Sequence, residues 1–407
     1  MTCLSRLVSA FVVLMPFLFG CEPGAPPSSL DVTRESLPNG ATLVRYASLT
    51  HQPTATLEAD LTIGSLEGES WEVFGDVRGI EADPDGSIYV LDFQSREIQV
   101  FDSEGSHLRT LGGPGDGPGE LTAANGLLMD PEGILWVNDH GKMRFLGLDS
   151  DGTELARIPF PVQSYGFIWE RMRDREGRFW MAAPQRDAPM TPPGEGLYES
   201  EARVYMKSIH PETGAVDSVH VGRTRSRSFV VPMSAGGQAF FPVPFDSRRA
   251  IGLDPEGGFW RSQGEEYHIT RLDARGDTTL VIEAAVPRLP VTASDRERVV
   301  ERMTEQDPGL DGPARELVAL APDRRPALDQ LFVDDEGRLW VRRVREEGAP
   351  PLYDLFDGGG GYLGSLETSF HPHTYWVPTV RGGHAYFLVP GELEVPTVVR
   401  TPIPPLR

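Results

Sequence analysis

The sequence predicts an all-β fold, a six-bladed β-propeller with four-stranded antiparallel blades and one short helical insertion between blades 4 and 5. Two observations predict it: a turn motif returns six times along the chain, and a second glycine turn follows most copies. The chain has 44 Gly and 36 Pro in 407 residues, so it is rich in turn formers. Its 39% of hydrophobic residues still suffice for a packed core, which argues against a disordered chain.

The first turn motif combines an Asp/Gly turn with the start of a strand. Its five near-complete copies and one degenerate sixth copy are Asp83–Tyr89, Asp130–Trp136, Asp174–Trp180, Asp254–Trp260, Asp334–Trp340 and Gly382–Phe387. The aspartate can accept hydrogen bonds from backbone N–H groups two residues on, and the glycine supplies a positive φ. An apolar-aromatic pair then opens a strand. Because the tryptophans recur at one structural position, we expect them to pack between blades.

The second turn motif places a glycine 19 residues after the first, at Gly105, Gly152 and Gly276. Stretched versions occur at Pro211–Gly214 and Asp357–Gly361. Each unit therefore consists of a strand, a turn, a strand, a loop, a strand, a turn and a strand. This is a four-stranded meander, the blade of a propeller.

Residues 75–160 resemble NHL-type repeats, including the run Gly112–Glu120. The mature chain is similar to bacterial six-bladed β-propeller lipoproteins of the NHL/TolB-like group. This resemblance implies the fold and says little about activity, because one propeller scaffold hosts many functions. We expect the strand Ala55–Ile63 to complete the last blade and close the ring.

The N-terminus predicts a secreted and lipid-anchored protein. Arg6 precedes the apolar run Leu7–Phe19, which is too short to span a bilayer and suits a signal peptide over residues 1–20. The run ends in Leu18-Phe19-Gly20-Cys21, which resembles the lipobox of bacterial lipoproteins and implies acylation of Cys21. The alternative is an ordinary secretory signal with an incidental cysteine. Residues 21–40 are expected to form a flexible tether, and residues 41–407 the propeller.

This anchor predicts a location on the outer face of a bacterial membrane, and so an extracytoplasmic protein. Glu22, rather than aspartate, follows Cys21, so no inner-membrane retention signal is present and the outer membrane is favoured where a cell has two. The formal net charge of −22 repels phosphate backbones and excludes non-specific nucleic-acid binding. With two cysteines, the chain has neither a disulfide framework nor a Cys-rich metal site.

The long insertions are predicted to gather on one face of the propeller, opposite the Asp/Gly turns. Pro184–Ser200 falls in the second loop of blade 3, whereas Arg223–Phe245 and Val286–Asp323 fall in blade connections. Within the last, Thr292–Met303 has a helical pattern, with Thr292 or Ser294 as its cap and Glu297 completing a capping box after Ser294. Because binding residues concentrate on loops of rigid scaffolds, this face is the expected binding face.

Polar residues at the start of each second loop should ring the mouth of the central channel on that face. The expected ligand-binding residues are Asp92, Asp139, His140, Arg186, Ser262 and Arg342. A mixed ring of this kind suits a small polar or anionic ligand or a peptide segment. The sequence therefore favours a binding or scaffold protein that recognises a protein partner or a small polar ligand, without catalytic residues or a cofactor.

The alternative is a lactonase-like propeller hydrolase or lyase with a divalent metal at the channel mouth. The candidate ligands are His140, His371 and His373, beside Asp139, and these residue types suit zinc. The same histidines are more simply interpreted as rim residues beside Tyr375. There is also no Gly-x-Ser-x-Gly elbow, and no cysteine other than Cys21 remains in the mature chain.

Overall fold

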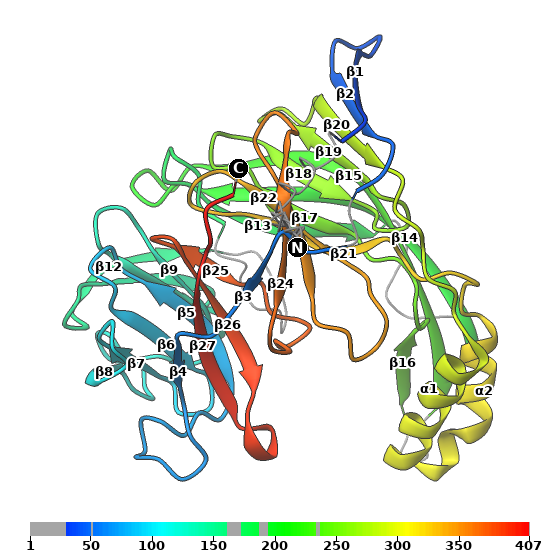
Figure 1. The fold of residues 1–407 in the computed structure, drawn as a ribbon. Coiled ribbons are helices and arrows are strands. Elements are labelled where there is room, and N and C mark those ends of the chain that lie inside the picture. Colours follow the sequence, from blue (N-terminus) through cyan, green and yellow to red (C-terminus); the bar gives the residue numbers. More distant parts are fainter. Residues whose placement is uncertain (1–29, 50–51, 161–171, 187–193, 233–236, 407) are drawn as a thin grey trace, which may run out of the picture.

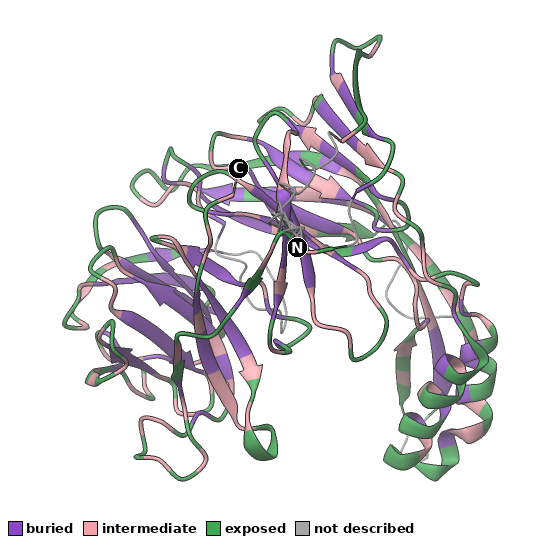
Figure 2. Ribbon diagram, viewed as in Figure 1, coloured by how far each residue is buried: buried purple, intermediate pink, exposed green. Residues whose placement is uncertain are grey.

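The computed structural model describes residues 30–49, 52–160, 172–186, 194–232 and 237–406; the signal peptide and Cys21 lie outside them. Within this part of the chain, six sheets follow one another along the sequence (Figure 1). Figure 2 shows that their strands are mostly buried. No helix in the described ranges is long and apolar enough to span a membrane.

Blades 1 and 2 are four-stranded antiparallel meanders, as predicted. Their strands are β5 (Val77–Ala82), β6 (Ile88–Asp92), β7 (Glu97–Phe101) and β8 (His107–Gly112), then β9 (Ala124–Met129), β10 (Leu135–Asp139), β11 (Arg144–Leu148) and β12 (Glu154–Pro159).

Blade 3 departs from the prediction because its strands extend beyond the ring. They are β13 (Phe179–Arg186), β14 (Gly196–Ile209), β15 (Val216–Pro232) and β16 (Gln238–Pro242). The described residues of Pro184–Ser200 and much of Arg223–Phe245, expected as loops, therefore belong to an elongated antiparallel sheet. Backbone N–H and C=O groups are satisfied more completely in a sheet than in a long loop, which accounts for the difference.

Blades 4 to 6 contain the remaining antiparallel strands. They are β17 (Ala250–Leu253), β18 (Phe259–Ser262), β19 (His268–Leu272) and β20 (Thr278–Ala284), then β21 (Leu328–Val333), β22 (Leu339–Arg343), β23 (Leu352–Phe356) and β24 (Tyr362–Thr368), then β25 (Thr379–Arg381), β26 (His384–Pro390) and β27 (Pro396–Pro402).

An N-terminal strap runs along the outer edges of these three blades. We define the strap as β2 (Thr42–Tyr46), β3 (Ala55–Leu57) and β4 (Leu61–Ile63). β2 pairs in parallel with β20 of blade 4, and β3 in parallel with β24 of blade 5. β4 pairs antiparallel with β27 and so supplies the outermost strand of blade 6. The closing strand is therefore β4 alone, since the first part of Ala55–Ile63 pairs one blade earlier.

An exposed strand, β1 (Val32–Ser36), pairs with β2 at the edge of blade 4. These residues fall within the range expected to be a flexible tether. The turn between β1 and β2 contains Gly40 at φ +85°, and the Ala41 amide donates to the Asn39 side chain at 3.2 Å. This hairpin turn is a local signal for strand pairing.

Two helices follow blade 4 where one was expected: α1 (Ala293–Gln306) and α2 (Asp311–Ala319). Thr292 caps α1, and the partner in its capping box is Asp295 rather than Glu297. Side chains of both helices pack on β15 and β16, in a cluster that includes Phe229, Val300 and Leu317. We call these helices, β16 and the outer halves of β14 and β15 the arm; it projects from the ring in Figure 1.

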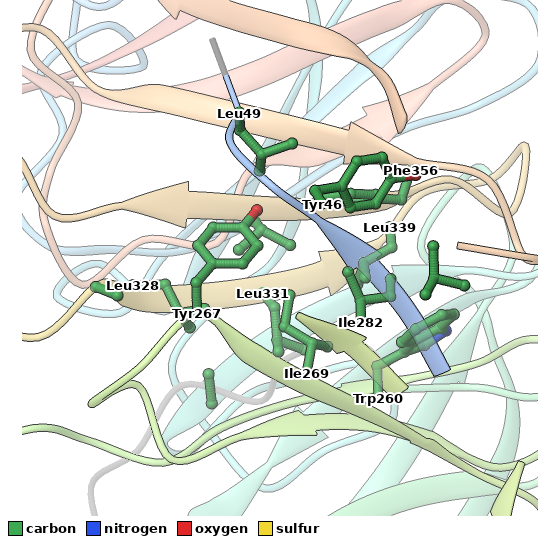
Figure 3. Close-up of a cluster of buried hydrophobic side chains, with 14 of the residues drawn as sticks. Tyr46, Leu49, Trp260, Tyr267, Ile269, Ile282, Leu328, Leu331, Leu339 and Phe356 are labelled. Atoms are coloured by element: carbon green, nitrogen blue, oxygen red, sulfur yellow. The ribbon is translucent and has the colours of Figure 1, made fainter. Parts of the chain in front are cut away.

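Clusters of buried apolar side chains lie between all six pairs of neighbouring blades and so close the ring. Each contains the aromatic residue of one turn repeat: Tyr89, Trp136, Trp180, Trp260, Trp340 and Tyr386. The expected inter-blade packing of the tryptophans is confirmed. Figure 3 shows the cluster between blades 4 and 5, which Tyr46 of the strap joins.

The repeated turns also form as predicted. Asp130 Oδ1 accepts hydrogen bonds from the amides of Glu132 at 3.0 Å and Ile134 at 2.8 Å, and Gly133 has a φ of +83°. Its Oδ2 accepts the indole N–H of Trp136 at 2.7 Å, a contact that turn chemistry alone does not predict. The same indole bond occurs at Asp174 and Asp334. One carboxylate therefore fixes both the turn and the aromatic ring that packs on the next blade.

Candidate functional site

Three of the residues predicted to ring the channel mouth are buried in local hydrogen bonds. Asp92 is 5% exposed and accepts bonds from the amides of Gly75, Asp76 and Gln94 at 2.8–3.0 Å. Ser262, 4% exposed, donates to the His268 carbonyl oxygen at 2.7 Å and accepts from the Gly264 amide. Both side chains fasten the second loop to its own blade.

Asp139 is also buried, with 0% of its surface exposed. It accepts hydrogen bonds from the Thr122 hydroxyl at 2.7 Å and the Ala123 amide at 2.9 Å, and it forms an ion pair with Arg144 at 2.7 Å. These partners occupy the carboxylate, so we do not include Asp139, Asp92 or Ser262 in the candidate site. Their ligand-binding role stays a sequence-based prediction.

The histidines do not assemble a metal centre. His140 is half-buried at the start of a short turn after β10, whereas His371 and His373 are exposed in the connection before β25. Among the residues that the structure describes, no three His, Cys, Asp or Glu side chains lie close enough to hold a metal ion. Arg186 is exposed at the end of β13, and none of these four residues lines the cavity described next.

A cavity of about 630 Å³ opens where blades 3 to 6 and the base of the arm meet. Its volume falls in the usual range of about 300–1,000 Å³ for small-molecule sites. Arg342, the remaining predicted residue, lines it. The other charged lining residues are Asp246, Arg248, Arg249, Arg325 and Asp329.

The cavity thus carries four arginines against two aspartates, in a chain whose net charge is −22. Both aspartates are engaged by arginines. Asp329 accepts from Arg342 at 2.7 Å, and Asp246 pairs with Arg227 of β15 at 3.0 Å. Burial nevertheless raises the pKa of Asp246 above its ordinary value, which indicates a poorly hydrated wall.

The remaining arginines are held to different degrees. Arg325 forms an ion pair with Asp295 at 2.8 Å and lies over the Phe245 ring at 5.0 Å. Phe245 itself has a φ of +61°, a strained conformation for an aromatic residue and one that is enriched at binding sites. Arg248 is exposed, and its side chain makes no ion pair or hydrogen bond with the described residues. An exposed guanidinium without a described counter-charge at the edge of a cavity is available to an anion.

Gln330 lines the cavity and has a buried side-chain amide. The residue is 8% exposed, and its side-chain N–H donates to the Trp376 carbonyl oxygen at 3.0 Å. Because the amide nitrogen donates this bond, the other terminal atom of the side chain is the oxygen Oε1. That buried Oε1 has no hydrogen-bond partner in the described structure. Less than 1 Å² of this oxygen is accessible, so it is closed off from the cavity in this structure.

Strand direction separates the cavity into a polar mouth and an apolar floor. Arg248 and Arg249 directly precede β17, and Ile251 lies deeper along it. Likewise Asp329 lies near the start of β21, and Leu331 follows. At its floor the cavity continues into a narrower space of about 80 Å³, and the shared residues are Met172, Ile251, Leu331 and Val377.

Reasoning from the sequence missed most of this site because, apart from the two histidines before blade 6, it considered only the second loop of each blade. The residues just before each innermost strand lie on the same face. The Arg248-Arg249 pair, placed directly before the strand that leads to Asp254, was the available signal.

Comparisons with known proteins agree with this architecture. The profile of a family described as 6-bladed beta-propeller matches residues 65–173, which span blades 1 and 2. The fold is a six-bladed β-propeller. Among curated proteins, no sequence matches the chain.

Solved structures of propellers resemble the chain only at low identity. Virginiamycin B lyase from Staphylococcus aureus is 11% identical with a TM-score of 0.39, over 84% of this chain and 99% of that one. A gluconolactonase from Xanthomonas campestris is 14% identical with a TM-score of 0.39, over 87% and 99%. A member of a family of unknown function from Bacteroides vulgatus is 10% identical with a TM-score of 0.45, over 85% and 97%. These likenesses carry no functional argument.

Proposed function

We propose that this protein is a cell-envelope binding module of the NHL/TolB-like kind, anchored through lipid on Cys21, that takes a small organic anion at the channel mouth. The observation that carries the proposal is the excess of arginine around the cavity of about 630 Å³ in a strongly acidic chain. An anion would gain from charge-assisted hydrogen bonds in a partly desolvated site. The lipid anchor rests on the sequence around Cys21 alone.

The rigid ring and the arm fit a binding role. Cavity residues come from four blades and from the base of the arm, so the ring positions them without loop closure. A protein partner on the arm-bearing face is the other form of this proposal. The described residues contain no converging set of His and carboxylate ligands that would support a metal-dependent hydrolase or lyase.

The test compares an anion with a neutral molecule of the same shape. Benzoate at ten times its Kd should stabilise the Cys21→Ser mature chain by about 1.4 kcal/mol, and benzamide should not. Thermal denaturation measures both. Arg248→Glu should remove the effect of benzoate, because among the cavity arginines Arg248 is the exposed one whose guanidinium has no partner in the described part of the chain.

Arg275→Glu is the matched control. Arg275 is exposed in a turn on the opposite face, where its nearest carboxylate is 3.5 Å away. This variant should keep the response to benzoate. Equal stabilisation by benzoate and benzamide, or an unchanged response in Arg248→Glu, would rule out anion recognition in this cavity.

A further inference from the structure

We infer that the ligand is an amphipathic organic carboxylate, with its anionic head at the arginines and an apolar tail on the cavity floor. The inference rests on the proposed function and specifies the ligand of that same site. It follows from how the polarity of the lining residues changes with depth.

The head is assigned to the mouth because all four cavity arginines come from its rim. Arg248, Arg249 and Arg325 precede the innermost strands β17 and β21. Arg342 lies near the end of β22, which pairs antiparallel with β21, so it reaches the same end of blade 5. Planar guanidinium groups suit the two oxygens of a carboxylate.

The tail is assigned to the floor because the side chains there are apolar. Met172, Ile251, Leu331 and Val377 line both the cavity and the narrower space below it. All the other residues around that space are also without charge except Arg173. A small, hydrophilic anion such as phosphate would leave this surface in contact with water and gain nothing from it.

The combination describes a carboxylate with an apolar chain, and not a sugar, a nucleotide or a metal ion.

The experiment uses a series of straight-chain carboxylates: butanoate, hexanoate and octanoate. They are titrated calorimetrically into the mature chain carrying Cys21→Ser. We expect the Kd to fall about four-fold for each added methylene, since each buried CH₂ contributes a fixed increment. Octanol, which lacks the head, should bind at least ten-fold more weakly than octanoate. Arg248→Glu should weaken octanoate about ten-fold, and Arg275→Glu should leave it unchanged.

The two proposals fail in different ways. If Kd does not change along the carboxylate series while benzoate is still preferred over benzamide, the amphipathic ligand is wrong and anion binding stands. If octanol binds as tightly as octanoate, the head assignment is wrong. If no anion binds in preference to its neutral counterpart, both proposals fall.

Discussion

Aspartates at strand ends hold the blades of this protein together by satisfying backbone amides. Asp92 and Asp139 occupy the same place in blades 1 and 2, and each accepts bonds from the amides 16 and 17 residues earlier. Arg96 and Met143, four residues after them, both adopt a positive φ near 50–60°. A repeated polar residue at a loop start is therefore a structural latch here, and it does not mark a ligand.

Replacing Asp139 by alanine tests this latch at the residue scale. The substitution leaves Arg144, itself 6% exposed, without its counter-charge and removes the acceptor of the Ala123 amide. We expect a loss of about 3–5 kcal/mol in the free energy of unfolding, measured by urea denaturation. Asp151→Ala, in an exposed turn of the same blade, should cost less than about 0.5 kcal/mol. A comparable loss in the two variants would contradict the assignment.

At the scale of elements, the strap joins three blades that are far from the N-terminus in sequence. Tyr46 is 3% exposed, and its hydroxyl donates to the Gly360 carbonyl oxygen at 2.7 Å and accepts from the Tyr362 amide at 2.8 Å. β4 covers the outer edge of β27 in blade 6. An uncovered strand edge is a site for aggregation, so the strap both stabilises and protects the ring.

Two truncations of the mature chain separate these roles. Removal of residues 22–38 deletes only the exposed β1 and what precedes it, and it should leave the melting temperature within a few degrees. Removal of residues 22–64 deletes the strap and should expose β27, so the protein should aggregate on size-exclusion chromatography. A monomeric protein of undiminished stability after the longer truncation would show that ring closure does not depend on β4.

At the scale of the whole molecule, a strongly acidic surface surrounds a cavity rich in arginine. Removing residues 1–20 takes away only the charge of Arg6, so the mature chain carries −23. The surrounding negative potential disfavours the binding of anions elsewhere on the surface, whereas the arginines favour it at the channel mouth. The proposed attachment through Cys21 would hold this site in the envelope.

The anchor is tested by a pair of cysteine variants. Cys21→Ser should move the protein from the membrane fraction to the soluble fraction without changing its melting temperature, because Cys21 precedes the folded ring. Cys3→Ser, within the predicted signal peptide, should leave the distribution unchanged. Fractionation and immunoblotting measure both, and persistence of the Cys21→Ser protein in the membrane fraction would contradict lipidation.

The repeats in the sequence determined the fold class. Each Asp/Gly turn is a local structure, set by the acceptor at Asp130 and the positive φ at Gly133, so it can be read from a few adjacent residues. The aromatic residues of the repeats predicted the inter-blade packing because they recur at one structural position. The number of blades followed from counting these turns.

Only the tertiary structure decided where the site lies and how the ring is closed. Arg248, Arg325, Gln330 and Arg342 are up to 94 residues apart in the chain and meet only when blades 4 and 5 pack together. The partners that bury Asp139 and engage Asp246 likewise come from other elements. Whether a polar side chain faces a ligand or an internal amide depends on these long-range contacts, which no local pattern encodes.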